Sequence, residues 1–261
     1  LPVFDGPKWR QNAIDTLRAF LPKDPPPVWV VLFTARSNAR FEVARVSAEE
    51  KVKAFKAAGV PVELVTDRNW RGFSSSKQAL LSSRSLKIVQ QPLPSAISKL
   101  SIRNDLDIDL ANGRQWPAVC EAADVALSVL AGWKSRKPIA VVGAKGFVGK
   151  HLISMLRDGD CQVIPLDKGD SLGSLAKAEF VISAASATGV LTARHIAKTH
   201  IVLDLGFEKT RNGPGRGNLT AGAIKKARYA TPVPGGMGPA QMAVLIERYA
   251  VSVRIPGPFG H

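Results

Sequence analysis

Apolar residues recur along the chain in two patterns, one typical of amphipathic helices and the other of strands. Spacings of three and four, together with start and stop signals, predict helices at about residues 9–21, 48–58, 117–130, 148–156 and 239–253. Short apolar runs predict strands at residues 28–33, 60–65, 86–89, 139–142, 162–166, 180–184 and 201–205. Because strands and helices alternate, we expect an α/β protein with parallel βαβ units.

Several predicted helices carry signals at their ends. Ser47-Ala48-Glu49-Glu50 has the form of a capping box, so we expect Ser47 to cap a helix that stops at Gly59. Pro117 suits the first turn of the following helix, and Pro239 suits the first turn of the last one. These signals give the predicted helices definite boundaries.

The chain is long enough for two domains. A length of 261 residues lies near the point where one hydrophobic core stops growing and chains divide. The composition changes abruptly at residues 133–138, Trp-Lys-Ser-Arg-Lys-Pro, which read as a basic, polar linker. We therefore expect a first domain over residues 1–134 and a second over residues 135–238.

Composition and charge exclude several classes of protein. Hydrophobic residues make up 45% of the chain and charged residues 22%, which excludes a mainly disordered chain. No uncharged apolar run reaches the length of about 18 residues that a membrane span needs. The net charge is +15, from 36 Lys and Arg against 21 Asp and Glu. Without a long basic run, this charge indicates either a solvated surface or a small polyanionic partner rather than nucleic acid.

The cysteines and histidines indicate no metal site. Cys120 and Cys161 have no Cys-x-x-Cys or His-rich companion, so we expect both to be reduced, buried and inert. The four histidines are isolated from one another and from carboxylates in the sequence, which predicts no bound metal. The first residues lack the pattern of a secretory signal, so we expect a cytoplasmic protein, with a cleaved targeting peptide left open.

A glycine-spaced turn follows the predicted strand at 139–142. Gly143, Gly146 and Gly149 lie between that strand and a helix, and a further strand follows. Glycine lets the backbone approach a pyrophosphate, and the free amides at a helix start attract its charge. The same spacing also occurs in ordinary helix–strand packing, but this context favours a dinucleotide site.

The strand at 162–166 ends in Asp167 and Lys168, and the two residues point to different cofactors. An acidic residue at this place bonds the ribose diol of NAD, whereas a lysine could pair with the 2′-phosphate of NADP. Asp167 could equally be a turn former before Gly169. The choice between NAD and NADP stays open at this point.

Several strings of the sequence resemble one enzyme family. The most specific is residues 231–239, Thr-Pro-Val-Pro-Gly-Gly-Met-Gly-Pro. It resembles the signature of the bifunctional methylenetetrahydrofolate dehydrogenase/methenyltetrahydrofolate cyclohydrolase family. Further strings resemble that family in the same order and extend the resemblance over nearly the whole chain: residues 3–8, 89–94, 105–107, 143–149 and 202–206.

The resemblance implies a fold and an activity. The fold would be two α/β domains flanking a cleft, with a Rossmann-like second domain and a C-terminal helix, residues 239–261, returning to the first domain. The family oxidises the methylene bridge of a tetrahydrofolate with NADP or NAD and then hydrolyses the methenyl product to the 10-formyl form. The resemblance also implies that the protein forms a homodimer.

The resemblance assigns roles to individual residues. Lys51 lies in a Lys-x-Lys-Ala context eight residues before Gly59, which matches the family's catalytic lysine. Gln90 would hold this lysine, and Asp107 would bond the amide edge of the pterin. The implied substrate-binding residues are Phe41, Ser47, Pro92, Leu93, Pro234, Gly235 and Gly236. The implied cofactor-binding residues are Gly143, Ala144, Lys145, Val148, Gly149, Asp167, Lys168, Ala184, Ala185 and Gly206.

The sequence also departs from the family pattern at folate and phosphate contacts. The family's folate-stacking tyrosine falls at Ser47, and an alternative alignment places Phe41 on the tyrosine and Arg45 on the lysine. Ile108 replaces a glycine, and Ala144-Lys145 replaces Arg-Ser. These changes mark a divergent member.

Two alternative functions stay open, one from these departures and one from the basic charge. One is a paralogue that keeps the nicotinamide domain and accepts a different nitrogenous or one-carbon substrate. The other is a non-catalytic protein that uses the basic surface to bind a nucleotide or nucleic acid.

Overall fold

The computed structural model describes residues 4–33, 39–67, 78, 80, 82–91, 93, 103, 106–110, 116–131, 137–209, 215–255 and 259, with only the backbone described at 39–41 and 131. These residues belong to two compact units. One unit comprises residues 1–9 and 116–241, and the other comprises residues 10–115 and 242–261. Each unit is described by itself.

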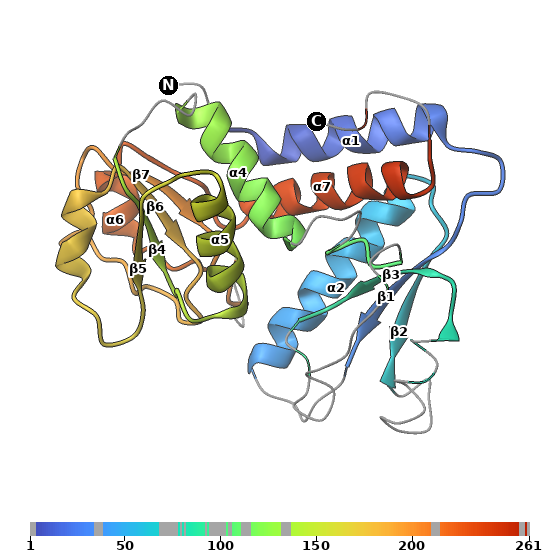
Figure 1. Cartoon of the computed structure of the whole chain (residues 1–261), viewed down its shortest axis with the longest axis horizontal. Coiled ribbons are helices and arrows are strands. Elements are labelled where there is room, and N and C mark those ends of the chain that lie inside the picture. Colours follow the sequence, from blue (N-terminus) through green and yellow to red (C-terminus); the bar gives the residue numbers. More distant parts are fainter. Residues whose placement is uncertain are drawn as a thin grey trace. The chain divides into compact units, whose positions relative to one another are not determined.

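The first unit is built around a five-stranded parallel sheet (Figure 1). Its strands, in the spatial order β5-β4-β6-β7-β8, are Val163–Leu166, Ile139–Val142, Phe180–Ser183, Ile201–Asp204 and Tyr229–Ala230. Every residue of β4, β6 and β7 is buried, as expected for apolar strands covered on both faces. The core next to the sheet is formed by Val142, Val181, Val202 and neighbouring Leu and Ala side chains.

Helices cover this sheet. They are α4 (Ala118–Ala131), α5 (Phe147–Asp158), the 3₁₀ helix η3 (Leu172–Lys177) and α6 (Ala221–Lys226). In Figure 1, α4 and α5 lie on the same side of the sheet. The predicted helices and strands of this unit agree with the structure to within two residues at most ends. The short elements η3, α6 and β8 were not predicted.

The second unit contains a three-stranded parallel sheet with the order β2-β1-β3. These strands are Val62–Thr66, Val28–Leu32 and Leu86–Val89. Helix α2 (Ala39–Ala57) packs against β1 and β2. Beyond β3, Asp107 forms a parallel bridge to Lys87. The segment at 106–108 therefore extends the sheet by one short piece of backbone.

The division between the two units falls within α1 (Gly6–Phe20) and within α7 (Met237–Ser252). The later part of α7 is anchored in the second unit by Tyr249. Its ring packs edge-on against Phe55 of α2, with centroids 5.7 Å apart, and its hydroxyl donates to the carbonyl of Pro26 at 2.8 Å. The C-terminal helix is expected to return to the N-terminal domain. This is confirmed, because residues 242–261 lie in the same unit as residues 10–115. The predicted boundary at 134 and 135 lies outside the described residues and stays a prediction.

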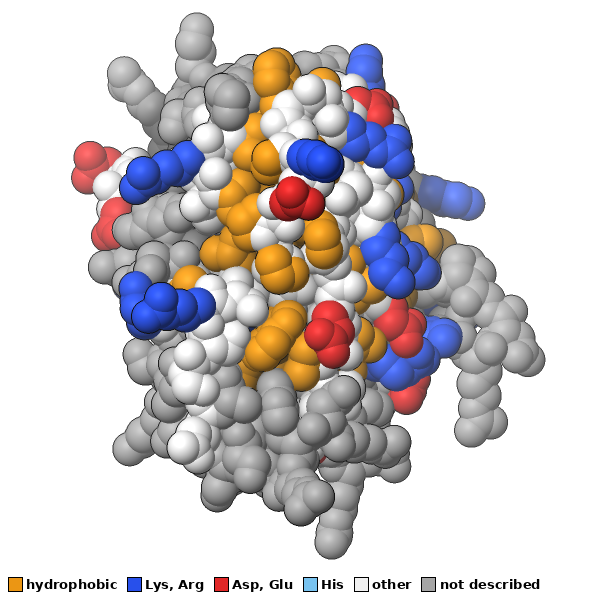
Figure 2. All heavy atoms as spheres, turned by 90° about the vertical axis from the view of Figure 1, so that its right-hand side faces the viewer, with side chains coloured by type: hydrophobic (Ala, Val, Ile, Leu, Met, Phe, Trp, Pro, Cys, Tyr) orange, Lys and Arg blue, Asp and Glu red, His pale blue; other side chains and the backbone are white. Residues whose placement is uncertain are grey.

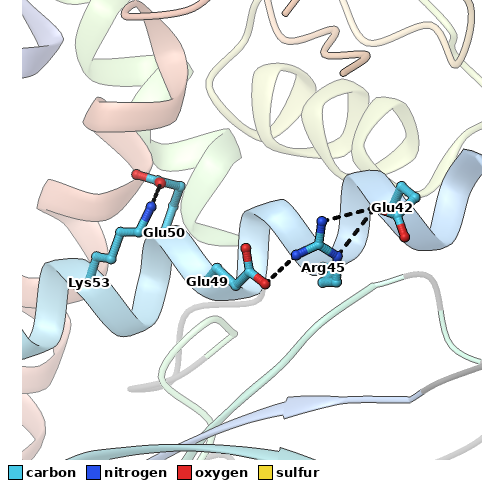
Figure 3. Close-up of polar contacts among 5 residues, drawn as sticks. All are labelled: Glu42, Arg45, Glu49, Glu50 and Lys53. Carbon is cyan, nitrogen blue, oxygen red and sulfur yellow. Dashed lines mark hydrogen bonds and ion pairs between the residues drawn. The ribbon is translucent and has the colours of Figure 1, made fainter. Parts of the chain in front are cut away.

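The predicted start of α2 is wrong. The helix begins at Ala39 instead of Ala48, so Ser47 lies inside it and is not its cap. Charged pairs on the exposed face support the additional turns (Figure 3): Arg45 contacts Glu42 at 3.0 Å and also pairs with Glu49 one turn later. Such pairs at spacings of three and four stabilise a helix. They offset the local preference for a start at Ser47.

Charged side chains of both signs lie on the surface (Figure 2), and the two cysteines are not bonded to each other. On the face drawn in Figure 2, Lys and Arg side chains are scattered among acidic and apolar side chains. Both cysteines are free, as expected, but Cys161 is partly exposed rather than buried because it lies in the turn before β5. No helix among the described residues is long and apolar enough to cross a membrane.

Candidate functional site

A buried lysine lies at the centre of the predicted catalytic residues. Lys51 is on α2 and is only 1% exposed. Its Nζ donates to Oε1 of Gln90 at 2.7 Å and lies 3.6 Å from Oδ2 of Asp109. A buried ammonium group requires such partners, because its removal from water is unfavourable otherwise. The structure therefore brings Lys51 and Gln90 together, as the resemblance implies.

Gln90 is fixed in place by the end of β3. Its amide N–H donates to the carbonyl of Val31 at 2.9 Å, which continues the ladder between β3 and β1. Its side-chain Nε2 donates to the carbonyl of Gln91 at 2.9 Å. Because the nitrogen of the side chain is held there, Oε1 is directed toward Lys51. The β3 strand thus positions the acceptor for the lysine.

Asp107 is held at the edge of the same sheet. The amide of Ile108 donates to the carbonyl of Lys87 at 2.8 Å, which fixes the backbone beside β3. Oδ1 of Asp107 accepts from the amides of Asp109 at 3.1 Å and Leu110 at 3.4 Å. Burial, and secondarily the charge of Asp109, raise the pKa of Asp107 to about 6. A carboxyl group with such a pKa can exchange a proton near neutral pH.

Two charged residues of this cluster were not predicted from the sequence. Asp109 supplies the carboxylate next to Lys51. Arg248 of α7 is buried, and its Nη1 donates to the carbonyl of Ile108 at 3.3 Å and to that of Asp109. A signal was present for both, because Asp109 continues an Asp-x-Asp-x-Asp alternation and Arg248 is a charge on an otherwise apolar helix face. We call Lys51, Gln90, Asp107, Asp109 and Arg248 the lysine cluster.

The other predicted residues of this unit contribute less to the site. Arg45 lies on the exposed face of α2 and is paired with glutamates, unlike Lys51. Ser47 is partly buried inside the helix. Leu93 packs against an apolar cluster that includes Val31. Pro92 lies outside the described residues, and so does the side chain of Phe41.

The predicted cofactor residues of the first unit gather at one edge of its sheet. Gly143, Asp167, Ala184 and Gly206 come directly after, or close after, β4, β5, β6 and β7, at the carboxyl ends of these parallel strands. The chain passes from β4 to β5 on one side and then to β6 on the other side. Ligands of open α/β sheets bind at such a reversal of strand order. The arrangement is therefore suited to a dinucleotide.

The turn after β4 has a backbone that only glycine accommodates. Gly143 has a φ of +87°, and a Cβ there would lie 2.6 Å from the carbonyl oxygen of Ala184. The turn leads into α5, whose N-cap Gly146 provides no side-chain cap. The first amides of a helix have no partners within it and attract anions. The turn and the start of α5, including Val148 and Gly149, thus fit the pyrophosphate of a dinucleotide.

Asp167 is tied to this turn. Its Oδ2 accepts from the amide of Lys145 at 2.6 Å, and its Oδ1 accepts from the amide of Lys168 at 2.7 Å. These bonds hold the pKa of Asp167 below its ordinary value. The side chain is therefore an ionised carboxylate that connects the end of β5 to the turn after β4.

A buried polar network fixes the loops after β6 and β7. The carboxylate of Asp204 accepts from the amides of Gly206, Asn218 and Leu219 at 2.9–3.1 Å. Burial raises the pKa of Asp204, and these hydrogen bonds oppose the rise. Nδ2 of Asn218 in turn donates to the carbonyl of Ala185 at 3.1 Å. Asn218 could not be identified from the sequence, because no local motif marks it.

The proline- and glycine-rich segment belongs to the same unit. The peptide bond from Val233 to Pro234 is cis, and Gly235 has a φ of +104°. Gly236 packs closely against the carbonyl of Pro232 and the side chain of Thr231. The segment has a defined path directly before α7, as its composition predicts.

One family model matches about half of the chain. Residues 120–255 match the family model described as tetrahydrofolate dehydrogenase/cyclohydrolase, NAD(P)-binding domain. A curated relative is the bifunctional protein FolD of Rickettsia akari, which is 33% identical over 61% of this chain and 63% of its own length. Another is the FolD protein of Limosilactobacillus reuteri, which is 26% identical over 92% of this chain and 87% of its own length. The aligned part of the chain thus spans less than two thirds of the first relative.

Solved structures show the same fold. The bifunctional FolD enzyme from Campylobacter jejuni superposes with a TM-score of 0.76 and 22% identity, covering 96% of this chain and 97% of that one. The FolD enzyme of Trypanosoma brucei, complexed with NADP cofactor and an inhibitor, gives a TM-score of 0.78 and 20% identity, covering 97% of each chain. At these identities the likeness shows the fold alone.

Proposed function

Because the chain belongs to the tetrahydrofolate dehydrogenase/cyclohydrolase family, we propose that it oxidises 5,10-methylenetetrahydrofolate to 5,10-methenyltetrahydrofolate with NADP or NAD. We propose hydrolysis of the methenyl product to 10-formyltetrahydrofolate as its second activity. The observation that carries the proposal is the lysine cluster. Lys51 is buried at the place that the family pattern implies and is bonded there to Gln90.

The oxidation requires a hydride acceptor next to the folate. A nicotinamide cofactor, held by the turn at residues 143–149, would supply that acceptor. The uncapped start of α5 and the glycine backbone of the turn support this placement. In the lysine cluster, the carboxyl group of Asp107 would bond the amide edge of the pterin and orient the methylene carbon.

The hydrolysis requires controlled proton movement, for which Lys51 is suited. Lys51 would first release the proton of its ammonium group to solvent; water would then add to the methenyl carbon and lose one proton to the resulting amine. The bond from that carbon to N5 then breaks, the remaining hydroxyl proton moves to N5, and the carbonyl of the 10-formyl group forms. Lys51 finally releases its proton to solvent. Gln90 would direct the amine through the hydrogen bond that its Oε1 accepts from Lys51.

A pair of lysine variants on one helix tests this role. Lys51→Met should reduce hydrolysis of methenyltetrahydrofolate by about 100- to 10,000-fold, the range typical of a lost acid–base group. Lys53→Met is the matched control, because the Lys53 side chain is 70% exposed and pairs only with Glu50 among the contacts described for it. The control should retain the activity of the unmodified chain. Equal rates in both variants would contradict lysine-assisted hydrolysis.

Binding measurements separate the alternative functions. A paralogue with another substrate would bind a nicotinamide dinucleotide in calorimetry and show no affinity for a tetrahydrofolate. A nucleic-acid-binding protein would bind RNA more tightly than a dinucleotide, with a steep dependence on salt. We also infer a homodimer from the family resemblance, which light scattering on the purified chain tests.

A further inference from the structure

We propose that Asp167 makes this chain selective for NAD over NADP, because its carboxylate already occupies amides that would face a 2′-phosphate. The inference rests on the proposed function, in which the turn at residues 143–149 binds a nicotinamide dinucleotide. It assigns to one side chain the cofactor choice that the sequence leaves open.

Asp167 bonds backbone amides in two different segments of the chain. A turn-forming aspartate bonds amides of its own loop, as Asp167 does with Lys168 at 2.7 Å. Its other oxygen accepts from the amide of Lys145, 22 residues earlier, at 2.6 Å. This second bond joins the end of β5 to the turn that follows β4. Asp167 is therefore part of the dinucleotide turn and not only a local turn former.

A 2′-phosphate and a ribose diol need opposite hydrogen-bonding partners. In sheets of this topology, the residue after the second strand lies at the ribose that carries the 2′-hydroxyl in NAD or the 2′-phosphate in NADP. A phosphate at that place needs donors, and a hydroxyl pair needs acceptors. Two backbone donors here, the amides of Lys145 and Lys168, are bonded to an internal carboxylate. Each oxygen of that carboxylate keeps a lone pair for a ribose hydroxyl.

The charged side chains near Asp167 also disfavour a 2′-phosphate. The ammonium groups of Lys145 and Lys168 could attract a 2′-phosphate, but two carboxylates lie in the loop that follows β5. Asp167 is one, and Asp170 is the other, since its Oδ2 accepts from the amide of Asp167 at 2.8 Å. Two positive and two negative side chains leave no net positive charge for a phosphate dianion. The like charge of Asp167 instead disfavours it.

Calorimetric binding of NAD and NADP to the full chain tests the inference. We expect NAD to bind at least about tenfold more tightly than NADP, which corresponds to about 1.4 kcal/mol. In Asp167→Asn this preference should fall to about unity or reverse, because the repulsion is lost and an amide nitrogen can donate. Asp160→Asn is the matched control: it removes the same charge from the turn before β5, at the opposite end of that strand, where a φ of 57° suits asparagine. It should keep the preference for NAD.

A second measurement needs no variant. AMP and 2′,5′-ADP differ only by the phosphate at the 2′ position of the ribose, so the unmodified chain should bind AMP more tightly. Equal affinities for NAD and NADP, or tighter binding of NADP, would overturn the inference and leave the proposed function standing. Loss of the preference in Asp160→Asn as well would also overturn it, since net charge would then decide the choice. No binding of either dinucleotide would overturn the proposed function together with the inference.

Discussion

Replacement of Asp107 by asparagine should stabilise the protein at alkaline pH. The side chain is 7% exposed, and its pKa rises from the ordinary value of 3.8 to about 6, mainly through burial. This rise corresponds to about 3 kcal/mol of preference for the neutral form. Asparagine is neutral at every pH and keeps an oxygen that can accept from the amides of Asp109 and Leu110. The charged carboxylate is therefore the unfavourable state in the folded protein.

The sign of the effect follows from the two pKa values. Because the pKa of Asp107 in the folded protein lies above that in the unfolded chain, its stabilising contribution is complete below about pH 4 and is lost as the pH rises through 6. Above that pH, Asp107→Asn should raise the free energy of unfolding by up to about 3 kcal/mol relative to the unmodified chain. Near pH 4 the two proteins should differ little.

Urea unfolding at pH 8 and at pH 4.5 measures this difference directly. Asp160→Asn serves as the control, because Asp160 is exposed and its replacement should change the free energy of unfolding about equally at both pH values. If Asp107→Asn destabilises the protein equally at both pH values, the carboxyl group is not held in an environment that favours its neutral form. Its assigned part in the lysine cluster would then lack its physical basis.

Three further substitutions test other buried or constrained residues. Arg248→Met should lower the free energy of unfolding by about 3 kcal/mol in urea, since it leaves buried carbonyls of the lysine cluster without their donor; an unchanged midpoint would contradict that contact. Gly143→Ala should lower the melting temperature and abolish dinucleotide binding, because of its φ of +87° and the nearby backbone; a variant that binds normally would refute the turn geometry. Burial lowers the pKa of His200, so stability should decline as the pH falls below about 6.5. His200→Gln should flatten this decline in thermal unfolding, and a pH profile identical to that of the unmodified chain would contradict the prediction.

Much of the fold could be predicted because most of its strands are buried in parallel sheets. Strands β3 and β4 consist of apolar residues alone or nearly alone, and their predicted ends agree with the structure. The glycine turn after β4 could be predicted for a related reason. Its requirement is steric and local, so the glycines themselves mark it.

Local signals failed where several of them competed. The capping-box pattern at Ser47 predicts a helix start, but the segment before it already forms helix with charged pairs around Arg45. The short elements η3, α6 and β8 have two to six residues each and too little periodicity to be recognised. Such elements depend on the sheet next to them.

The lysine cluster could be predicted only in part. Lys51, Gln90 and Asp107 follow from family strings, whereas the contact of Arg248 with the loop after Asp107 joins residues about 140 positions apart. The partner of Asp167 is a backbone amide that carries no sequence signature. Contacts of this kind arise from tertiary packing, and a single sequence does not state them.

The proposed hydride transfer can be followed atom by atom with a labelled substrate. The purified chain is mixed with 5,10-methylenetetrahydrofolate carrying deuterium in its methylene bridge and with NAD or NADP, and the nicotinamide is recovered for mass spectrometry. We expect reduced nicotinamide that contains one deuterium atom and is therefore one mass unit heavier than the reduced cofactor formed from unlabelled substrate. Reduced nicotinamide without deuterium, or none with either cofactor, would contradict the account.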